Sequence, residues 1–131
     1  MNRRTTLSLM TLAVISLGIS LPAGKAAAQG KTQAYYVANI APADPVGWAE
    51  TYAPLVPPTF QPFGGHYIVR AGKTTTVAGD SPSRVVIIAF DSAEKAQAWL
   101  DSAAYKAILP TRAKFLGNGK YSAYIVDGVA N

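Results

Sequence analysis

His66 and Arg70 are the two side chains best suited to chemistry on a small molecule. His66 is the only histidine of the chain, and imidazole is the side chain that titrates near neutral pH without help, so it could act as a general base. Arg70 follows four residues later, and alternation along a strand predicts that both side chains lie on one face. A guanidinium can hold a carboxylate through two parallel hydrogen bonds. Both are therefore candidate catalytic residues.

Each of these two residues could also have an ordinary structural role. No acid or nucleophile lies at motif spacing next to His66, so it could equally be a surface histidine at the start of a strand. Arg70 could pair with an acidic side chain or reach across a dimer interface. The sequence therefore names these residues without assigning a reaction to them.

Aromatic residues could line a pocket for a small ligand. We expect most of them to form the core, since rings dominate core area. Tyr36, Trp48 and Tyr105 are nevertheless candidate ligand-binding residues, because small-ligand sites are mostly apolar with a few polar groups. Asn39, near the end of the first expected strand, would add an amide. Arg112 would add a cation, or else stabilise the end of a helix through its dipole.

Composition excludes several classes of site. The chain has no cysteine and one histidine, which rules out disulfides, thiol nucleophiles and zinc sites built from two histidines. We expect no metal and no cofactor. Of 12 basic residues, three lie in the first 28 residues, where there is no acid, so nine face seven acids in the remainder and its net charge is +2. That charge, with no phosphate loop and no RNA-binding signature, argues against nucleic acid as a partner.

The first 28 residues have the three parts of a secretory signal peptide. Arg3 and Arg4 provide a basic start, the 15 residues 7–21 form an apolar run, and Ala26–Ala28 offer small residues for cleavage after Ala28. The run is short of the roughly 20 residues that span a bilayer. We expect residues 1–28 to be the signal and 29–131 the mature domain, periplasmic or secreted, with only transient membrane contact through the signal. Export by the general secretory route or, given the arginine pair, by the twin-arginine route stays open.

The remaining residues predict the order strand, helix, strand, strand, helix, strand. Aromatic and β-branched residues favour strands over 33–40, 66–71, 84–90 and 120–127. Asp44 and Pro45 predict the start of a helix that prolines then kink or divide before residues 64–65. Residues 91–94 have capping-box spacing for a second helix, and Ser102 is expected to cap a further short one. Residues 74–77 could extend a hairpin arm.

This order predicts an α+β fold, the ferredoxin-like plait of a four-stranded antiparallel sheet with helices on one face. A sheet covered on one side should alternate apolar and polar residues, yet residues 35–38 and 85–88 are apolar on both faces. Burying one large apolar side chain is worth about 1.5–3 kcal/mol, so an exposed face of this kind favours association. We expect a homodimer through the sheet face.

Several motifs resemble the DUF1330 family over most of residues 32–127. They are the segments 34–38, 56–59, 64–72, 96–99 and 102–105, followed by Arg112. The resemblance implies a dimeric α+β barrel of unestablished biochemical activity, in a superfamily with cofactor-free monooxygenases, isomerases and haem-handling enzymes. Many members have Arg-Gly-Gly after the second strand, where this chain has Arg70-Ala71-Gly72, so we expect an ordinary β conformation at Ala71.

Two functions remain open at this point. The mature protein could be an exported homodimeric α+β barrel that binds or transforms a small aromatic or carboxylated molecule without a cofactor. It could instead be a non-catalytic structural or binding dimer whose polar residues hold the interface. Whether it is an enzyme is left undecided by the sequence.

Overall fold

The computed structural model describes residues 32–130, so the expected signal peptide lies outside the described residues. The elements are β1 (Ala34–Ala41), α2 (Pro45–Gly47), η1 (Trp48–Tyr52), η2 (Ala53–Leu55), α3 (Pro57–Phe60), η3 (Gln61–Phe63), β2 (His66–Arg70), β3 (Arg84–Phe90), α4 (Ala93–Asp101), α5 (Ala103–Leu116) and β4 (Lys120–Asp127). Within this range, no helix is both long enough and apolar enough to cross a bilayer.

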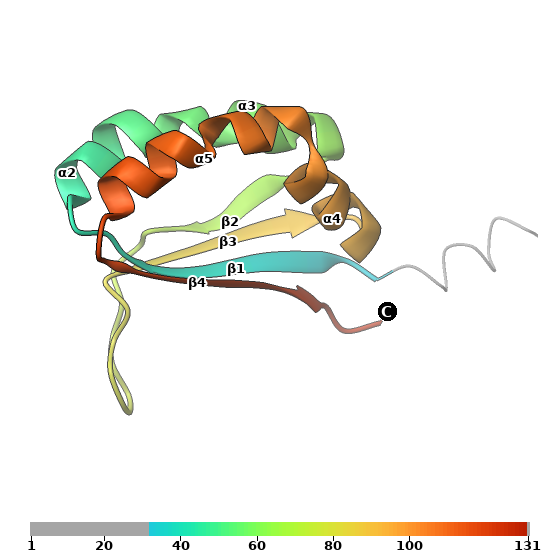
Figure 1. Ribbon diagram of the computed structural model, residues 1–131. Helices are drawn as coiled ribbons and strands as arrows, with labels where there is room; N and C mark the ends of the chain where they lie inside the picture. The colour runs from blue at the N-terminus through green and yellow to red at the C-terminus, as the bar shows by residue number, and fades with distance from the viewer. Residues whose placement is uncertain (1–31, 131) are drawn as a thin grey trace, which may run out of the picture.

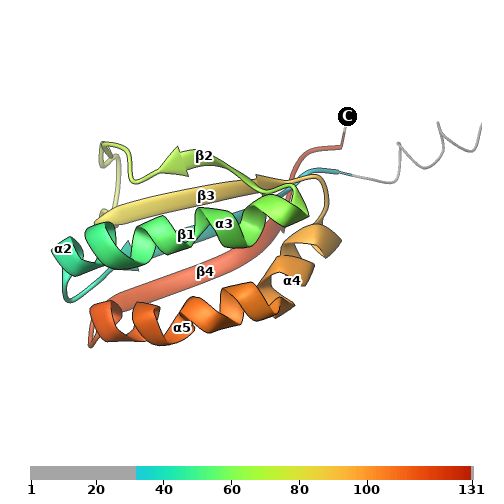
Figure 2. The ribbon, with the colours of Figure 1, turned by 90° about the horizontal axis from the view of Figure 1, so that it is seen from above.

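The four strands form one antiparallel sheet in the order β2-β3-β1-β4. Within residues 32–130, the helices lie on one face of the sheet, and the opposite face carries none (Figure 1). Seen from above, the segment from α2 to α3 and helix α5 run side by side over the sheet (Figure 2). This is the predicted ferredoxin-like arrangement, and the sheet stays open within one chain.

Prolines divide the first helical segment, as predicted. Asp44 caps it, its Oδ1 accepting a hydrogen bond from the Gly47 amide at 2.9 Å, and Pro45 occupies the first helical position. A π-helical turn, a 3₁₀ turn, a short α-helix and a second 3₁₀ turn follow, the last three each beginning with or next to a proline. Gly64 ends the segment with φ at 76°, a left-handed conformation that glycine adopts without strain.

Serine caps begin the two later helices. Ser92 Oγ accepts from the Lys95 amide, and Ser102 Oγ accepts from the Tyr105 amide, both at 3.2 Å. The helix after Ser102 is longer than predicted, because α5 continues for 14 residues through Pro110. A proline inside a helix removes one backbone hydrogen bond. Packing of α5 side chains on both sides of Pro110 against the core offsets this loss.

An aromatic core fills the space between sheet and helices. Its largest fully buried side chains are Trp48, Trp99, Phe60 and Phe90. Trp99 Nε1 donates to Thr59 Oγ1 at 2.9 Å, and Thr59 donates to the carbonyl of Val56 at 2.6 Å, so the indole nitrogen and the buried hydroxyl are both satisfied. The core therefore fixes the helices on the sheet through packing and a short polar chain.

The opposite side of the sheet is apolar, as the sequence predicted. Along β1 the buried residues alternate with half-buried ones, and cross-strand partners share a face. Val37, for example, pairs with Ile87 on β3 and with Tyr124 on β4. The outer face is defined by Tyr35, Val37, Asn39, Val85, Ile87, Tyr124 and Val126. Tyr124 is 52% and Val126 44% exposed, so nothing in the described chain covers them.

The connection between β2 and β3 is a long arm, residues 71–83, with no strand of its own. It extends from the sheet on the side away from the helices (Figure 1). Ala71, at its start, has φ of 52°, so the expected β conformation is wrong. The chain must turn out of the sheet plane here, and a left-handed residue makes that turn. The Ala71 amide donates to the Val85 carbonyl at 2.8 Å, which holds the turn in place.

Candidate functional site

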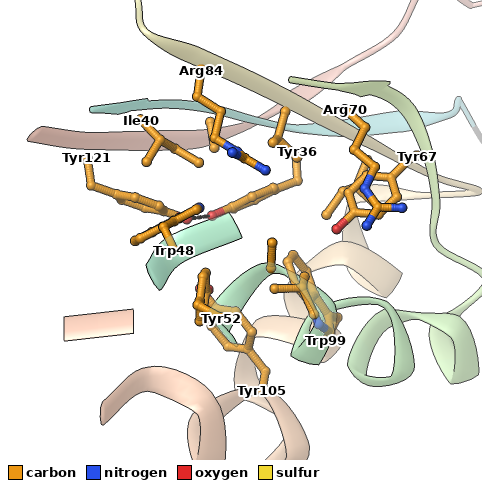
Figure 3. A pocket seen from close by; sticks show the side chains of 15 residues that line it. Tyr36, Ile40, Trp48, Tyr52, Tyr67, Arg70, Arg84, Trp99, Tyr105 and Tyr121 are labelled. Carbon is orange, nitrogen blue, oxygen red and sulfur yellow. Dashed lines mark hydrogen bonds between the residues drawn. The ribbon is translucent and has the colours of Figure 1, made fainter. Parts of the chain in front are cut away.

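The candidate site is a pocket between the sheet and the helices, with a volume of about 40 Å³. Seven aromatic side chains and six aliphatic ones form most of its lining, and two arginines complete it. Trp48 and Tyr52 come from η1, Trp99 from α4 and Tyr105 from α5, all facing the sheet (Figure 3). A cavity of this volume holds a few water molecules, so a larger ligand needs a lining side chain to move.

Arg84 and Arg70 supply positive charge to the pocket. Both extend from the sheet toward the space between the layers (Figure 3). Arg84 pairs with Ile40 in the sheet, on the side that faces the helices. Its Nε is buried and has no hydrogen-bond partner in the described part of the chain, residues 32–130. The Arg70 guanidinium lies 5.0 Å from the ring centroid of Tyr67.

Among residues 32–130, no acidic side chain lines this pocket. Within the same range, the one ion pair is between Lys95 and Asp91, and neither of these residues lines the pocket. Arg84 is only half-buried as a residue, but its Nε is buried, and a buried donor on a charged group costs free energy while it has no partner. The pocket therefore has an electrostatic environment suited to an anion.

Four tyrosine hydroxyls and Arg112 form the polar end of the site. The hydroxyls of Tyr36 and Tyr121 are hydrogen-bonded to each other. Arg112 Nη1 donates to the hydroxyl of Tyr105 at 2.7 Å, and its guanidinium lies 4.7 Å from the ring centroid of Tyr121. Burial raises the pKa of Tyr36, Tyr52 and Tyr121, so these phenols stay protonated at neutral pH. They can donate hydrogen bonds to an anion.

His66 and Arg70 do not lie on the same face, so that prediction is wrong. A bulge between Tyr67 and Val69 shifts the register of β2 by one residue. His66 pairs with Ala89 and is exposed on the outer side, whereas Arg70 pairs with Val86 and lines the pocket. An imidazole in this position is not part of the pocket.

The other predicted ligand-binding residues divide into two groups. Tyr36, Trp48 and Tyr105 line the pocket, and Arg112 contacts its wall through Tyr105 and Tyr121. Asn39 belongs to the outer face and lines a separate open groove beside the base of the 71–83 arm. Asn39 and Tyr36 are therefore on opposite sides of the sheet.

Sequence reasoning missed Arg84, Tyr52, Tyr67 and Tyr121. Arg84 has the same strand parity as the buried Ile88, and Tyr121 has the same parity as Ile125, which packs against the core. This parity was a usable signal for both residues. No such parity signal existed for Tyr67, because the bulge in β2 determines that Tyr67 and Arg70 face the same side of the sheet.

The fold and this site define a single-sheet α+β protein with an aromatic, cationic pocket beneath its helices. Residues 33–129 match the family described as a domain of unknown function, DUF1330, and the chain belongs to that family. No curated protein matches the chain significantly.

Solved structures share the fold. A protein of unknown function from Rhodopseudomonas palustris is 12% identical, with a TM-score of 0.60, and the match covers 83% of this chain and 94% of that one. A dimeric ferredoxin-like protein of unknown function from Thermobifida fusca YX is 15% identical, with a TM-score of 0.51, covering 74% of this chain and 92% of that one. At these identities the likeness concerns the fold alone.

Proposed function

We propose that this protein binds a small aromatic carboxylate in the pocket between its sheet and its helices. The observation that carries the proposal is the buried Arg84 Nε, which has no partner in a pocket without acidic residues. A carboxylate would satisfy that nitrogen and compensate the charge of Arg84. Arg70, on the neighbouring strand, gives a second cation for the same group.

The aromatic side chains of the pocket would bind the ring of the proposed ligand. Trp48 and Tyr52 lie with ring centroids 4.5 Å apart, and Trp99 and Tyr105 with centroids 4.6 Å apart. A ligand ring beside these pairs would gain edge-to-face or offset contacts. Tyr67 and Arg70 are the lining residues that can move to admit it, because Tyr67 is only half-buried and Arg70 is exposed.

The binding unit in this proposal is a homodimer formed by two outer faces. The exposed apolar side chains of that face support it, since a monomer would leave them in water. The Thermobifida fusca structure of similar fold is described as dimeric. Two open sheets packed in this way give the dimeric α+β barrel expected from the sequence.

The place of action in this proposal is the periplasm or the outside of the cell. The basic start, the apolar run and the alanines before residue 29 support export with removal of residues 1–28. Sequencing the N-terminus of the exported protein tests this. The expected first residue is Gln29, and a mature protein that retains Met1 would contradict it.

Binding rather than catalysis is the function that the pocket supports. His66 lies outside it, and burial raises the pKa of the Tyr36 and Tyr52 phenols within it. The second candidate is a non-catalytic structural dimer. The unpartnered Arg84 Nε favours the ligand, since a purely structural pocket gains nothing from an unsatisfied buried donor.

Calorimetric titration with benzoate, cyclohexanecarboxylate and benzamide tests the proposal. Benzoate should bind most tightly, because benzamide lacks the charge and cyclohexanecarboxylate lacks the aromatic ring. Arg84→Met should weaken benzoate binding about 10- to 100-fold, the equivalent of one charge-assisted hydrogen bond of about 1.5–3 kcal/mol. His66→Ala is the matched control and should leave binding unchanged. Equal affinity for benzoate and benzamide, or no effect of Arg84→Met, would rule the proposal out.

A further inference from the structure

The 71–83 arm is tied to the sheet at its base, where Ser83 Oγ donates to the Ile40 carbonyl at 2.6 Å, and is open to solvent beyond it. Residues 71–81 are all exposed, and Val77, in the middle of the arm, is 95% exposed. The arm extends from the sheet opposite the helices in Figure 1, and in the view from above it stays close to one end of β2 and β3 (Figure 2). The two views together place it roughly perpendicular to the sheet, on the side of the outer face.

Local interactions give the arm a defined direction. The Ala71 amide bonds to the Val85 carbonyl at its base, and the hydroxyls of Thr74 and Ser81 lie 3.2 Å apart across its two limbs. Gly79 turns the chain with φ of 71°. Val77 is not covered by the described chain, so its side chain would be buried only by contact with a second surface.

The length of the arm indicates where that surface lies. Val77 follows Ala71 by six residues, and an extended chain spans at most about 3.3–3.6 Å per residue, so Val77 can stand about 20 Å from the base of the arm. Two sheets packed face to face lie about 10 Å apart. The arm is therefore longer than the distance between the two sheets of such a dimer. Its tip would extend along the side of the second sheet.

We propose that the 71–83 arm clasps a second copy of this chain, with Val77 in contact with that copy. This inference rests on the sheet-face dimer proposed above. An open groove of about 580 Å³ runs between the arm base and the sheet, lined by Asp80 and Ser81 on one side and by Asn39 and Ser122 on the other. Asn39 belongs to the outer face, so the groove continues the surface on which the second copy would sit. Two-fold symmetry gives each dimer two such arms.

A photo-crosslinking side chain tests the contact. p-Benzoylphenylalanine in place of Val77 should give a covalent dimer on irradiation. In a mixture of ¹⁴N- and ¹⁵N-labelled protein, the crosslinked peptides should join the two isotopes. The matched control is the same probe in place of Val46, which is 64% exposed on the helix side and should give no covalent dimer.

Sedimentation velocity of the unmodified protein distinguishes failure of the arm contact from failure of the sheet-face dimer. A dimeric protein whose probe at position 77 yields no intermolecular crosslink would overturn the arm contact and leave the sheet-face dimer standing. A monomeric protein would overturn both. Val77→Ser gives a second readout, because each dimer then loses two buried valines, one from each arm, and should be weakened about 100-fold or more. An unchanged dimer dissociation constant in Val77→Ser would contradict the proposal.

Discussion

The hydroxyls of Tyr36 and Tyr121 are hydrogen-bonded to each other at the polar end of the pocket, although they belong to different strands. In the sheet, Tyr36 of β1 pairs with Ile125, and Tyr121 of β4 pairs with Ile40. The two phenols therefore extend toward each other along the strands, from backbone positions that are not partners. This hydrogen bond joins the wall of the pocket across the β1–β4 pair.

Removing one of these hydroxyls should destabilise the protein. Tyr36→Phe leaves the Tyr121 hydroxyl without this partner, and an unsatisfied buried hydroxyl costs about 1–3 kcal/mol. The double variant Tyr36→Phe/Tyr121→Phe should recover part of the loss, since both polar groups are then gone. Urea unfolding of the four proteins gives the coupling energy. Strict additivity of the two single changes would show that the hydrogen bond contributes nothing.

Alkaline pH should unfold the protein through the same phenols. Burial raises the pKa of Tyr36, Tyr52 and Tyr121 in the folded state above the ordinary value of 10.0. Above that value the unfolded chain loses these protons while the folded chain keeps them, so the free energy of unfolding falls as pH rises. Each phenol contributes a slope of about 1.4 kcal/mol per pH unit. Below pH 10 these groups contribute no slope.

Urea unfolding between pH 8 and pH 11 measures that slope. Tyr36→Phe should make the decline above pH 10 shallower by one proton. Ile88→Val, which removes one buried methylene group and no titrating group, is the control and should leave the slope unchanged. Identical slopes in wild type and Tyr36→Phe would count against a buried, protonated Tyr36.

Ala71→Gly should stabilise the protein. Ala71 has φ of 52°, where a side chain costs roughly 1–2 kcal/mol relative to glycine. Relief of this strain outweighs the greater freedom of glycine in the unfolded chain, so a gain of about 1 kcal/mol is expected. Ala98→Gly, at an exposed position inside α4, should destabilise by about 1 kcal/mol. Thermal unfolding should show a higher melting temperature for Ala71→Gly and a lower one for Ala98→Gly. A lower melting temperature for both variants would refute the strain at Ala71.

Ile87→Glu should disrupt the proposed dimer without preventing folding. Ile87 lies at the centre of the outer face, beside Val37, and is only half-buried in the single chain. A carboxylate there would be desolvated on association, at a cost of several kcal/mol. Val46→Glu, on the helix side, is the control. Sedimentation velocity should show a monomer for Ile87→Glu and a dimer for Val46→Glu; a dimer in both would place the interface elsewhere.

Strand order, helix starts and the apolar outer face were predictable because each has a local signature. Asp44 with Pro45, and Ser102, mark helix starts through side-chain chemistry that acts within one turn. Apolar residues on both faces of β1 and β3 indicate that both faces of the sheet are packed, and this pattern can be read from the sequence without knowing the tertiary contacts. The prolines of the first helical segment likewise predict its divisions.

The residues that line the pocket were less predictable, because one bulge in β2 decides which side chains of that strand face the helices. The run from His66 to Arg70 reads as a regular strand, and no residue type in it marks the extra residue that turns Arg70 toward the helices. Arg84 was overlooked because it begins a continuous apolar strand, whose alternation is hidden by its own side chains. Strand parity with Ile88 could have placed Arg84, whereas Arg70 is recognisable as a pocket residue only through cross-strand register.

The same bulge limits how many copies can assemble. It lies in β2, the border strand of the sheet, where it interrupts the row of free amides and carbonyls that a further strand would need for continuous pairing. Lateral growth into a longer ribbon is thereby discouraged, while face-to-face stacking is unaffected. In the proposed dimer, this five-residue border strand with its bulge favours a closed, face-to-face pair over lateral extension along the β2 edge.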